Sequence, residues 1–550
     1  MPSPATHLRA PLLWLLFPLR TGFAAATLWP APGGHLLPLV SIAAGLGVIA
    51  VWLAARPGRW AQVSWTLCLS AACALAGFVM LHLREPQLHQ WENQPPRETT
   101  VTLRINQLYA SSPQSRSFSG VGEIVATGEY DQALLSRRVY FSAVRRISVM
   151  PQRSGLYVVR GVIEPLPRDP AEASFNDYLA NLGIRQKITR SRVLSEVSPP
   201  GRFRQFCNRA EIRLEKILVH GLEHRPSASS LYLAMLLGQK AVLSTEQQNA
   251  FMRTGTFHIF SISGLHVGII ALALHSVLRL LQVPRRATVL LTLGILWLYL
   301  EVTGINSPAL RSFLMIAFLL GTQVFHLPGN SLAALSAAAL LTLLLDPMQL
   351  FSTGFQMSYA VVTALVVMGA PLSEKILARW HPFAALPRLN WRWYHDFYNW
   401  SGRKVLGAGA AGWVAFLASA PSGIGYFHLF SPGSLFANLI VVPLSSLAII
   451  GGFLSLLLGL GGFTPWSALF NAAAAVTILL MDWLAQHGTQ LPGFYFDVHF
   501  VRSWMAPVSL VAMTGIMLAG LAGRWSRRYG GYWPPVVLLA LILIFGVKFG

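Results

Sequence analysis

The sequence predicts a polytopic α-helical membrane protein that carries a small inserted β-barrel domain. Of its 550 residues, 54% are hydrophobic and only 11% are charged, whereas a soluble protein carries about 25% charged residues. Apolar runs of about 18 residues or more recur through the second half of the chain, and each is long enough to cross a bilayer. The runs are continuous rather than alternating, so helices are expected to satisfy the backbone inside the membrane.

The first 83 residues predict N-terminal transmembrane helices. The basic loop that ends at Arg59 is expected to be cytoplasmic under the positive-inside rule. The chain after residue 83 is therefore expected to emerge on the outer face. The predicted spans occupy residues 10–29, 37–55 and 61–82.

Residues 84–200 predict a small extracytoplasmic β domain. Charge returns here, and short stretches rich in β-branched and aromatic residues are separated by glycine or polar turns. Several short strands in about a hundred residues favour a small barrel or sandwich. The predicted strands lie within residues 101–110, 120–130, 137–149 and 155–166.

Arginine and aromatic residues are interleaved along these strands. Cationic grooves with aromatic platforms hold single-stranded nucleic acid without sequence preference. The alternative, which the pattern alone favours, is that the aromatic residues form the barrel core and the arginines its solvated face. The pattern includes Arg104, Arg160, Tyr109, Phe141 and Tyr157, and the candidate contact residues are Arg137, Arg138, Tyr140, Arg145 and Arg146.

Residues 201–256 predict an amphipathic helical connector. Charged and apolar residues alternate at three- and four-residue spacing between Asn208 and Leu222. Ser244 precedes a predicted helix and Gln247 follows three residues later, which is the pattern of a capping box. We expect this block to suit a membrane surface.

Residues 257–550 predict a bundle of roughly ten further transmembrane helices. Its basic loops, near residues 279–286 and 372–404, are separated by four predicted spans, so both are expected on the cytoplasmic side. Residues 424–461 leave two interpretations open, a regular span or a re-entrant segment covered by protein. The net charge of +21 fits the positive-inside rule, and also a polyanionic partner.

Polar residues gather where this bundle begins. His258 and Ser261 are three residues apart, Ser263 and His266 are three apart, and His266 is eight from His258, so a helix would place them near one stripe. Gly264, with a second glycine four residues later, has the spacing that lets another helix approach closely. The sequence therefore predicts a helix face that is polar and that carries small residues, which we call the thin face.

Four interpretations of this face are open. Interhelical hydrogen bonds would be purely structural, and a polar pathway would be functional. A metal site lacks a third ligand at a telling spacing, and a serine nucleophile lacks a visible carboxylate partner. We therefore expect no catalytic residue, no metal and no cofactor, and no Walker A motif is present.

Further polar residues lie at the ends of predicted spans or at breaks in them. Arg311 falls in the first turn of a predicted helix, where its charge does not complement the helix dipole. It is expected either to extend to the membrane interface or to face a polar path. Gln356 and Asn438 complete the candidate pathway or gating residues, and Glu301, Asn306, Ser307, Asp346, Ser358 and Pro443 lie near them.

Several ordered motifs resemble one family, the ComEC-type competence proteins, which are inner-membrane DNA-uptake channels of naturally transformable bacteria. The resemblance covers the chain from about residue 60 to the last spans. Its most specific part is "LLGQKAVLSTEQQNAFMRTGTFHIFSISGLHVG". The other motifs are "EASFNDYLANLGI", "TGINSPALRSFLM", "DPMQLFSTGFQMSYA" and "FSPGSLFANLIVVPL".

The resemblance implies a location, a cargo and partners. Residues 84–200 would be an OB-like domain on the outer face of the inner membrane that contacts single-stranded DNA. The bundle, surrounded by membrane lipids, would pass one strand across the membrane into the cytoplasm. A periplasmic DNA receptor and a cytoplasmic helicase-like motor would be the protein partners.

One departure from the family concerns its nuclease. Many members carry a C-terminal metallo-β-lactamase-like domain, whereas no H-x-H-x-D-H pattern occurs in this sequence. We therefore expect either a short form without that domain, which relies on another nuclease, or a truncated or repurposed gene, and not an enzyme. The competing functions are a transporter of another anionic solute or lipid, and an intramembrane hydrolase.

Overall fold

The computed structural model describes residues 11–30, 36–56, 58–85, 95–109, 117–144, 151–167, 176, 179–180, 182–327, 329–526, 528 and 530–550. The chain forms two compact units. The first combines Met1–Asp169, Ser174–Gln205 and Leu314–Phe355, and the second combines Pro170–Ala173, Phe206–Phe313 and Gln356–Gly550.

The predicted fold class is confirmed. In the described part of the chain, nine helices are long and apolar enough to cross a membrane, and five shorter apolar helices accompany them. A closed five-stranded barrel lies between the N-terminal helices and the main bundle in the sequence. The protein is therefore a multi-pass helical membrane protein with a small barrel domain.

The N-terminal helices of the first unit pack through small residues. A side chain at Gly22 in α1 would overlap the backbone of Ala74 in α3, and one at Gly77 would overlap the backbone of Leu19. Close approach of this kind is how helices associate where lipid removes the hydrophobic driving force. The helices of this unit are α1 (Pro11–Leu28), α2 (Leu36–Ala54), α3 (Arg59–Arg84), the part of α10 (Ser307–Val324) from Leu314 onward, and α11 (Ser331–Leu345), and the turn η6 spans Pro347–Phe351.

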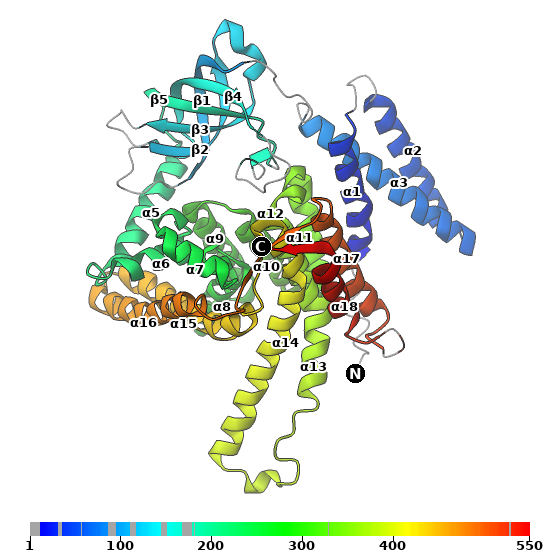
Figure 1. Cartoon of the computed structure of the whole chain (residues 1–550), viewed down its shortest axis with the longest axis vertical. Coiled ribbons are helices and arrows are strands. Elements are labelled where there is room, and N and C mark those ends of the chain that lie inside the picture. The colour runs from blue at the N-terminus through cyan, green and yellow to red at the C-terminus, as the bar shows by residue number, and fades with distance from the viewer. Residues whose placement is uncertain are drawn as a thin grey trace. The chain divides into compact units, whose positions relative to one another are not determined.

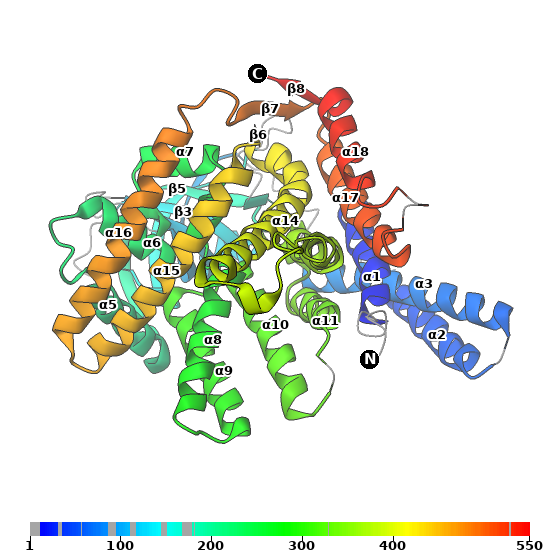
Figure 2. The ribbon, with the colours of Figure 1, turned by 90° about the horizontal axis from the view of Figure 1, so that it is seen from below.

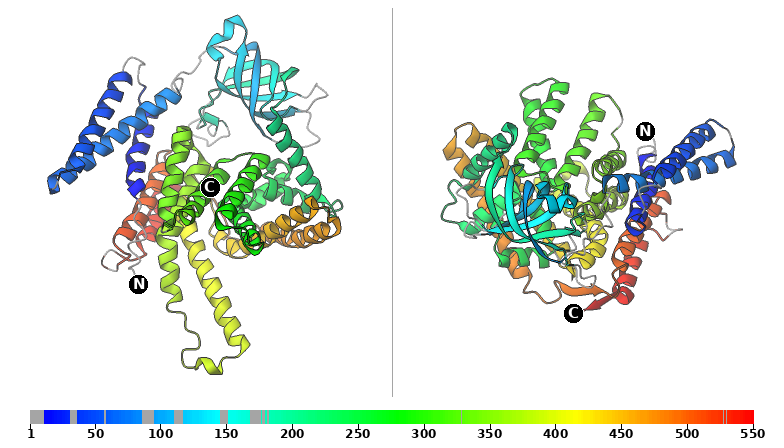
Figure 3. Two further views of the ribbon diagram at one scale, coloured as in Figure 1. Left: turned by 180° about the vertical axis from the view of Figure 1, so that it is seen from behind. Right: turned by 90° about the horizontal axis from the view of Figure 1, so that it is seen from above.

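The barrel closes in the order β1-β2-β3-β5-β4, and Figure 3 shows it from above. Its strands are β1 (Arg97–Tyr109), β2 (Ser117–Thr127), β3 (Arg138–Val144), β4 (Leu156–Pro165) and β5 (Gln186–Ser198). All pairs are antiparallel except β3 with β5. A small Greek-key barrel with this number of strands has the architecture of OB-folds.

The fifth strand, β5, is absent from the sequence prediction. Its buried positions are Gln186 and Ile188 on one side of Arg190, and Ser191 and Val193 on the other, so the alternation changes phase there, and polar residues hold two of the four. Arg190 also adopts a positive φ of 50°, which interrupts the regular pairing with β4. Pairing with β3 and β4, which closes the barrel, therefore makes this segment a strand although its hydrophobic alternation is weak.

The second unit contains the main bundle. Figure 2 shows α8 beside α9 and α15 beside α16. Its helices are α5 (Arg202–Val219), α6 (Pro226–Leu237), α7 (Thr245–Arg253), α8 (Gly264–Leu280), α9 (Arg285–Thr303), the start of α10 (Ser307–Val324), α12 (Thr353–Ala364), α13 (Ala370–Leu377), α14 (Trp393–Phe427), α15 (Ser434–Leu460), α16 (Thr464–Gly488), α17 (Met505–Ala522) and α18 (Pro534–Leu541).

One expectation for this unit needs correction. Every residue of α6 from Ser230 to Leu237 is buried, so α6 is an interior helix and does not lie on a membrane surface. A helix that is apolar all round belongs in a core. Of the two interpretations left open for residues 424–461, the regular span agrees with the structure, because α14 ends at Phe427 and α15 (Ser434–Leu460) runs without a break through Pro443.

A three-stranded sheet joins helix ends that are far apart in the sequence. Strands β6 (Leu429–Phe430), β7 (Phe496–Phe500) and β8 (Val547–Phe549) pair in that order. They follow α14, α16 and the final helical segment, so alternate loops of the bundle meet at one end. Helices that cross a membrane in succession likewise have alternate loops on the same side.

One buried side chain fastens the connector to the bundle. Asn471 of α16 is fully buried, and its amide donates to the carbonyls of Ile217 (2.8 Å) and His220 (3.0 Å) at the end of α5. Its Oδ1 accepts from the hydroxyl of Tyr232 in α6 (3.3 Å). The carbonyls at a helix end have no intrahelical partner, so Asn471 replaces the water that would otherwise solvate them.

We expect Asn471→Ala to lower the thermal stability of the purified protein. It leaves two buried carbonyls and one hydroxyl without partners, each at a cost of about 1–3 kcal/mol. Melting in detergent, followed by tryptophan fluorescence, measures the effect. Thr477→Ala on the same helix is the control, because Thr477 bonds only to its own helix. Equal melting temperatures for the two variants would contradict this role of Asn471.

Candidate functional site

The polar motif at the start of the bundle is divided between a turn and a helix. Helix α8 begins at Gly264, and His258 lies in the preceding 3-10 turn η5 (Phe257–Phe260). Ser261 follows that turn and precedes the helix. The prediction that His258, Ser261, Ser263 and His266 lie on one helical stripe is therefore wrong. The turn is as apolar as a transmembrane helix, but it is not part of α8.

The two threonines of the motif end α7. Thr254 Oγ1 donates to the Ala250 carbonyl (2.9 Å) and lies 2.8 Å from Thr256 Oγ1. Between them, Gly255 has a φ of 69°, and a Cβ added there would lie 2.7 Å from Cβ of Ser434 at the start of α15. Only glycine suits both the left-handed backbone and this close approach.

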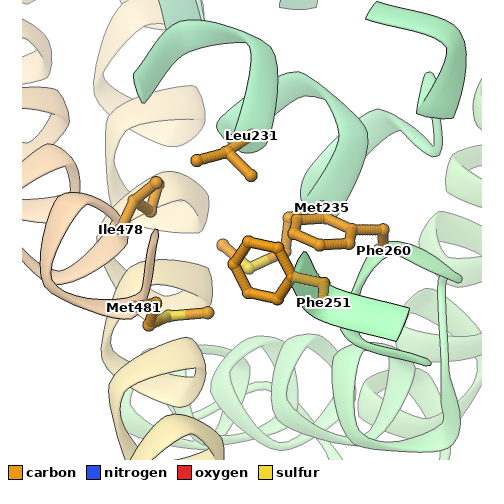
Figure 4. Close-up of a pocket in the computed structure, with 6 residues that line it drawn as sticks. All are labelled: Leu231, Met235, Phe251, Phe260, Ile478 and Met481. Atoms are coloured by element: carbon orange, nitrogen blue, oxygen red, sulfur yellow. The ribbon is translucent and has the colours of Figure 1, made fainter. Parts of the chain in front are cut away.

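An apolar layer supports this turn. Figure 4 shows side chains of α6, α7, η5 and α16 directed toward one another. The Phe251 and Phe260 rings are 4.7 Å apart between centroids and nearly perpendicular, a favourable edge-to-face geometry. The residues of the layer are Leu231, Met235, Phe251, Phe260, Ile478 and Met481.

His266 has one satisfied and one unsatisfied ring nitrogen. Its Nδ1 lies 2.9 Å from Ser263 Oγ and 3.4 Å from the Ser263 backbone nitrogen. The residue is 1% exposed, and its buried Nε2 has no partner in the described part of the chain. An unpaired buried polar atom is costly, so the site holds binding capacity that the local fold does not use.

Of the two predicted glycine contacts, one is present. A Cβ at Gly264 would lie 3.1 Å from Ser312 Oγ of α10, whereas nothing lies within 4 Å of one at Gly268. The start of α8 is thus in contact with the start of α10. The thin face extends over one turn, not two.

Arg311 points into the bundle. The residue is 2% exposed, and its guanidinium carbon lies 5.1 Å from the ring centroid of Tyr359 in α12. Of the two alternatives for Arg311, extension to the membrane interface is excluded by this burial. A cation over an aromatic face is stabilised by the ring quadrupole.

Gln356 extends the polar contacts to α14. It lies one turn before Tyr359 on α12, and its Oε1 accepts from the Tyr426 hydroxyl at 2.7 Å. We call His266, Arg311, Gln356, Tyr359 and Tyr426, from α8, α10, α12 and α14, the polar cluster. Contacts join Arg311 to Tyr359 and Gln356 to Tyr426, and the start of α8, which carries His266, meets α10 through the close approach of Gly264 to Ser312. Asn438, near the start of α15, has a buried Oδ1 without a partner among the described residues, but no contact joins it to the cluster.

The other polar residues near span ends mostly act as caps. Asn306 Oδ1 accepts from the backbone N–H of Ala309 at the start of α10 (2.9 Å). Asp346 accepts from the backbone of Met348 and the side chain of Gln349. These contacts satisfy donors that a helix start leaves free, so a structural role suffices for both residues.

The barrel aromatics separate into two groups. Phe141 and Tyr157 are 1% exposed and lie in the barrel core, as the structural alternative predicts. Tyr140 and Tyr109 lie outside that core, with ring centroids 6.3 Å apart, and contact a second apolar cluster around Leu179. Tyr140 is thus half-buried and offers only part of its ring to a ligand.

Several barrel arginines form ion pairs. Arg138 contacts Glu85 at 3.0 Å and Arg160 contacts Glu98 at 2.8 Å, while Arg104 lies 4.0 Å from Glu123. Hydrogen bonding to Glu98 raises the pKa of Arg160. Arg137 has a buried Nε without a partner among the described residues. Arg145 and Arg146 lie outside the described residues.

Sequence reasoning missed the residues that hold this region together. Gly255 carries a readable signal, because a glycine between two threonines after a helix predicts a left-handed turn. Tyr359 and Tyr426 carry none, since tyrosine is common in apolar helices and its partners are set by tertiary packing. The capping box of Ser244 and Gln247 was predicted and is confirmed.

We expect Gly255→Ala to destabilise the protein by about 2 kcal/mol or more, because alanine is strained at positive φ and would press on Ser434. Gly268→Ala is the matched control, since that glycine is helical and faces open space. Thermal melting and membrane abundance measure both variants. A Gly255→Ala protein as stable as Gly268→Ala would refute the close approach.

Comparison with known proteins adds the family. The chain matches the Competence protein family over residues 235–525. It is 27% identical over 227 residues to ComE operon protein 3 of Bacillus subtilis, covering 41% of this chain and 26% of that protein. It is 21% identical over 411 residues to Recombination protein 2 of Haemophilus influenzae, covering 72% of this chain and 48% of that protein.

The chain thus spans about half the length, or less, of the curated relatives it matches. No solved structure matches it. The family match includes α8, α10, α12 and α14, and so all residues of the polar cluster. Because this match extends over more than half of the residues, the chain belongs to the Competence protein family.

Proposed function

We propose that the protein is an inner-membrane channel that moves single-stranded DNA into the cytoplasm during natural transformation. In this proposal the barrel lies on the outer face and receives the strand from a periplasmic DNA receptor. A cytoplasmic helicase-like motor then draws the strand inward. The family and the names of its relatives, a competence-operon protein and a recombination protein, support this role.

The observation that carries the proposal is the burial of Arg311 in an apolar bundle. A cation inside a membrane protein is costly and marks an ion or substrate path. A guanidinium binds phosphate through two parallel hydrogen bonds. His266 supplies a second polar atom near the start of α8, so a passing phosphate meets donors where the bundle is otherwise apolar.

The contacts of the barrel suit a positioning role. Ion pairs hold Arg138 and Arg160, which leaves Arg137 as the described candidate best placed to bind a phosphate. Half-buried Tyr140 offers a ring for stacking. The barrel therefore binds DNA weakly and without sequence preference, as an entry surface requires.

One observation favours a second candidate, an intramembrane hydrolase. Ser263 Oγ and His266 Nδ1 are within hydrogen-bond distance, at 2.9 Å, which is the spacing of a nucleophile and its base. No carboxylate orients the other imidazole nitrogen among the described residues. Covalent labelling of Ser263 by a fluorophosphonate would favour the hydrolase over the channel. A transporter of another anion would leave transformation intact in a deletion strain.

We expect His266→Ala to abolish transformation while membrane abundance stays normal. His266→Asn, which keeps a short acceptor for the Ser263 N–H, guards against loss by misfolding and is also expected to fail. His275→Ala on the same helix is the control. The measurement is transformation frequency in a strain whose own family member is deleted. Normal DNA entry in both His266 variants would remove His266 from the pathway.

Arg311 has its own test. Arg311→Gln is expected to lower transformation by at least about thirtyfold, because a buried charged contact is lost. Arg311→Lys keeps the charge but not the two-pronged geometry, so it should retain part of the activity. Equal transformation by the glutamine variant and the wild type would contradict a phosphate contact at this position.

The barrel is tested by binding. Residues 84–200, expressed alone, are expected to bind an oligo-dT strand with an affinity that falls as salt rises, by a log–log slope of about 0.7 per phosphate neutralised. Arg137→Gln should reduce that slope, whereas Arg160→Gln, already paired with Glu98, should not. The fragment must first show a cooperative melt. A folded fragment without salt-sensitive binding would rule out the entry surface.

A further inference from the structure

We propose that the tip of the α13–α14 hairpin is a second site for single-stranded nucleic acid. This tip, residues 379–404, is called the aromatic arm. Figures 1 and 3 show the hairpin extending past the other helices of the second unit. None of the candidate residues derived from the sequence lies in it. The proposal rests on the proposed function, because only DNA uptake would bring a strand to this end of the bundle. The binding test below does not depend on that function.

The aromatic arm is a built structure. Trp380 lies over Gly402 of α14, where an added Cβ would be 2.4 Å from the indole. The Phe383 ring contacts the rings of His395 (4.7 Å) and Tyr398 (5.6 Å). These contacts fix the loop between α13 and α14 against one face of α14, so the opposite face is held in place.

That opposite face carries three aromatic side chains at helical spacing. Trp393, Phe397 and Trp400 follow one another at four and three residues, which places them along one stripe. They are 79%, 60% and 59% exposed. Large rings at this exposure are platforms on which successive bases stack, whatever the sequence.

The charge of the arm matches a polyanion. Five cationic residues and one aspartate lie in it. All five cations are exposed, and none is paired with a carboxylate within the described residues. The cations are Arg379, Arg388, Arg392, Arg403 and Lys404. Arginine beside stacked rings is how proteins hold single strands.

A lipid surface accounts for only part of the stripe. Residues 405–427 of α14 contain no charge, and at about 1.5 Å per residue they already exceed the hydrocarbon core of about 30 Å. The headgroup layer adds about 5–8 Å on each side. Trp400 falls within that layer, but Phe397 and Trp393 lie about 12 and 18 Å beyond Val405 along the helix. Two of the three rings therefore face water.

A protein partner fits less well than a nucleic acid. Hydrophobic docking surfaces are depleted of charge at their centre, whereas cations lie at both ends of this stripe. The basic loops also place the arm on the cytoplasmic side. A strand that leaves the bundle there would meet the arm first.

The test uses the full-length protein in nanodiscs of uncharged lipid and a fluorescent oligo-dT of about fifteen residues. Replacing Trp393, Phe397 and Trp400 together by leucine keeps apolar surface and helix propensity but removes stacking. Fluorescence anisotropy should show the arm's Kd rising by at least about thirtyfold. Trp393→Phe with Trp400→Phe keeps stacking and should bind like the wild type.

Cross-linking separates the arm from the barrel. Oligonucleotides that contain iododeoxyuridine react with aromatic rings on which they stack, so wild-type adducts are expected within residues 391–404 and should vanish in the leucine variant. Trp466→Leu with Trp483→Leu controls for loss of exposed tryptophan elsewhere. Melting temperature checks that every variant is folded.

Wild-type affinity and cross-linking in the leucine variant would overturn the proposal. Two other results would also overturn it. If anionic vesicles alone covered the arm, the arm would be a lipid contact. If a cytoplasmic protein but not DNA bound the arm, it would be a protein contact. Failure of the proposed function looks different. A deletion strain that transforms normally would refute uptake, while oligonucleotide binding by the arm would be unchanged.

Discussion

A polar group inside an apolar helix bundle has to find its partner within the bundle, because neither lipid nor bulk water can supply one. Much of this protein follows from that constraint. Asn471 closes the end of α5, and Thr254 closes the end of α7. These pairings fasten the ends of α5 and α7, and α6 between them is an interior helix.

Two buried polar residues indicate function. His266 keeps a buried nitrogen that has no partner among the described residues, and Arg311 brings a permanent charge into the bundle, where the ring of Tyr359 lies against it. A fold selected only for stability would replace both by apolar residues at little cost. Their presence at the meeting point of several helices is the physical basis for a path that accepts an anionic strand.

The sequence predicted helices and strands correctly where one pattern of hydrophobic residues dominates a segment. Continuous apolar runs gave the helices, and alternation gave four of the five strands. The start of α8 at Gly264 was missed because the residues of η5 are as apolar as the helix they precede. The contacts of Asn471 join residues 251 and 254 positions apart, and no local pattern contains such pairings. For the same reason Arg311 had two open orientations until tertiary packing selected one.

The central claim is that DNA passes the polar cluster, and cysteine accessibility tests it most directly. In a background without Cys68, Cys73 and Cys207, a cysteine at Ser263 can be probed with a small charged thiol reagent in competent cells. We predict that the reagent reaches this cysteine from water and that DNA held in mid-transfer blocks the reaction. A cysteine that stays unreactive, or reacts equally with and without DNA, would contradict the account.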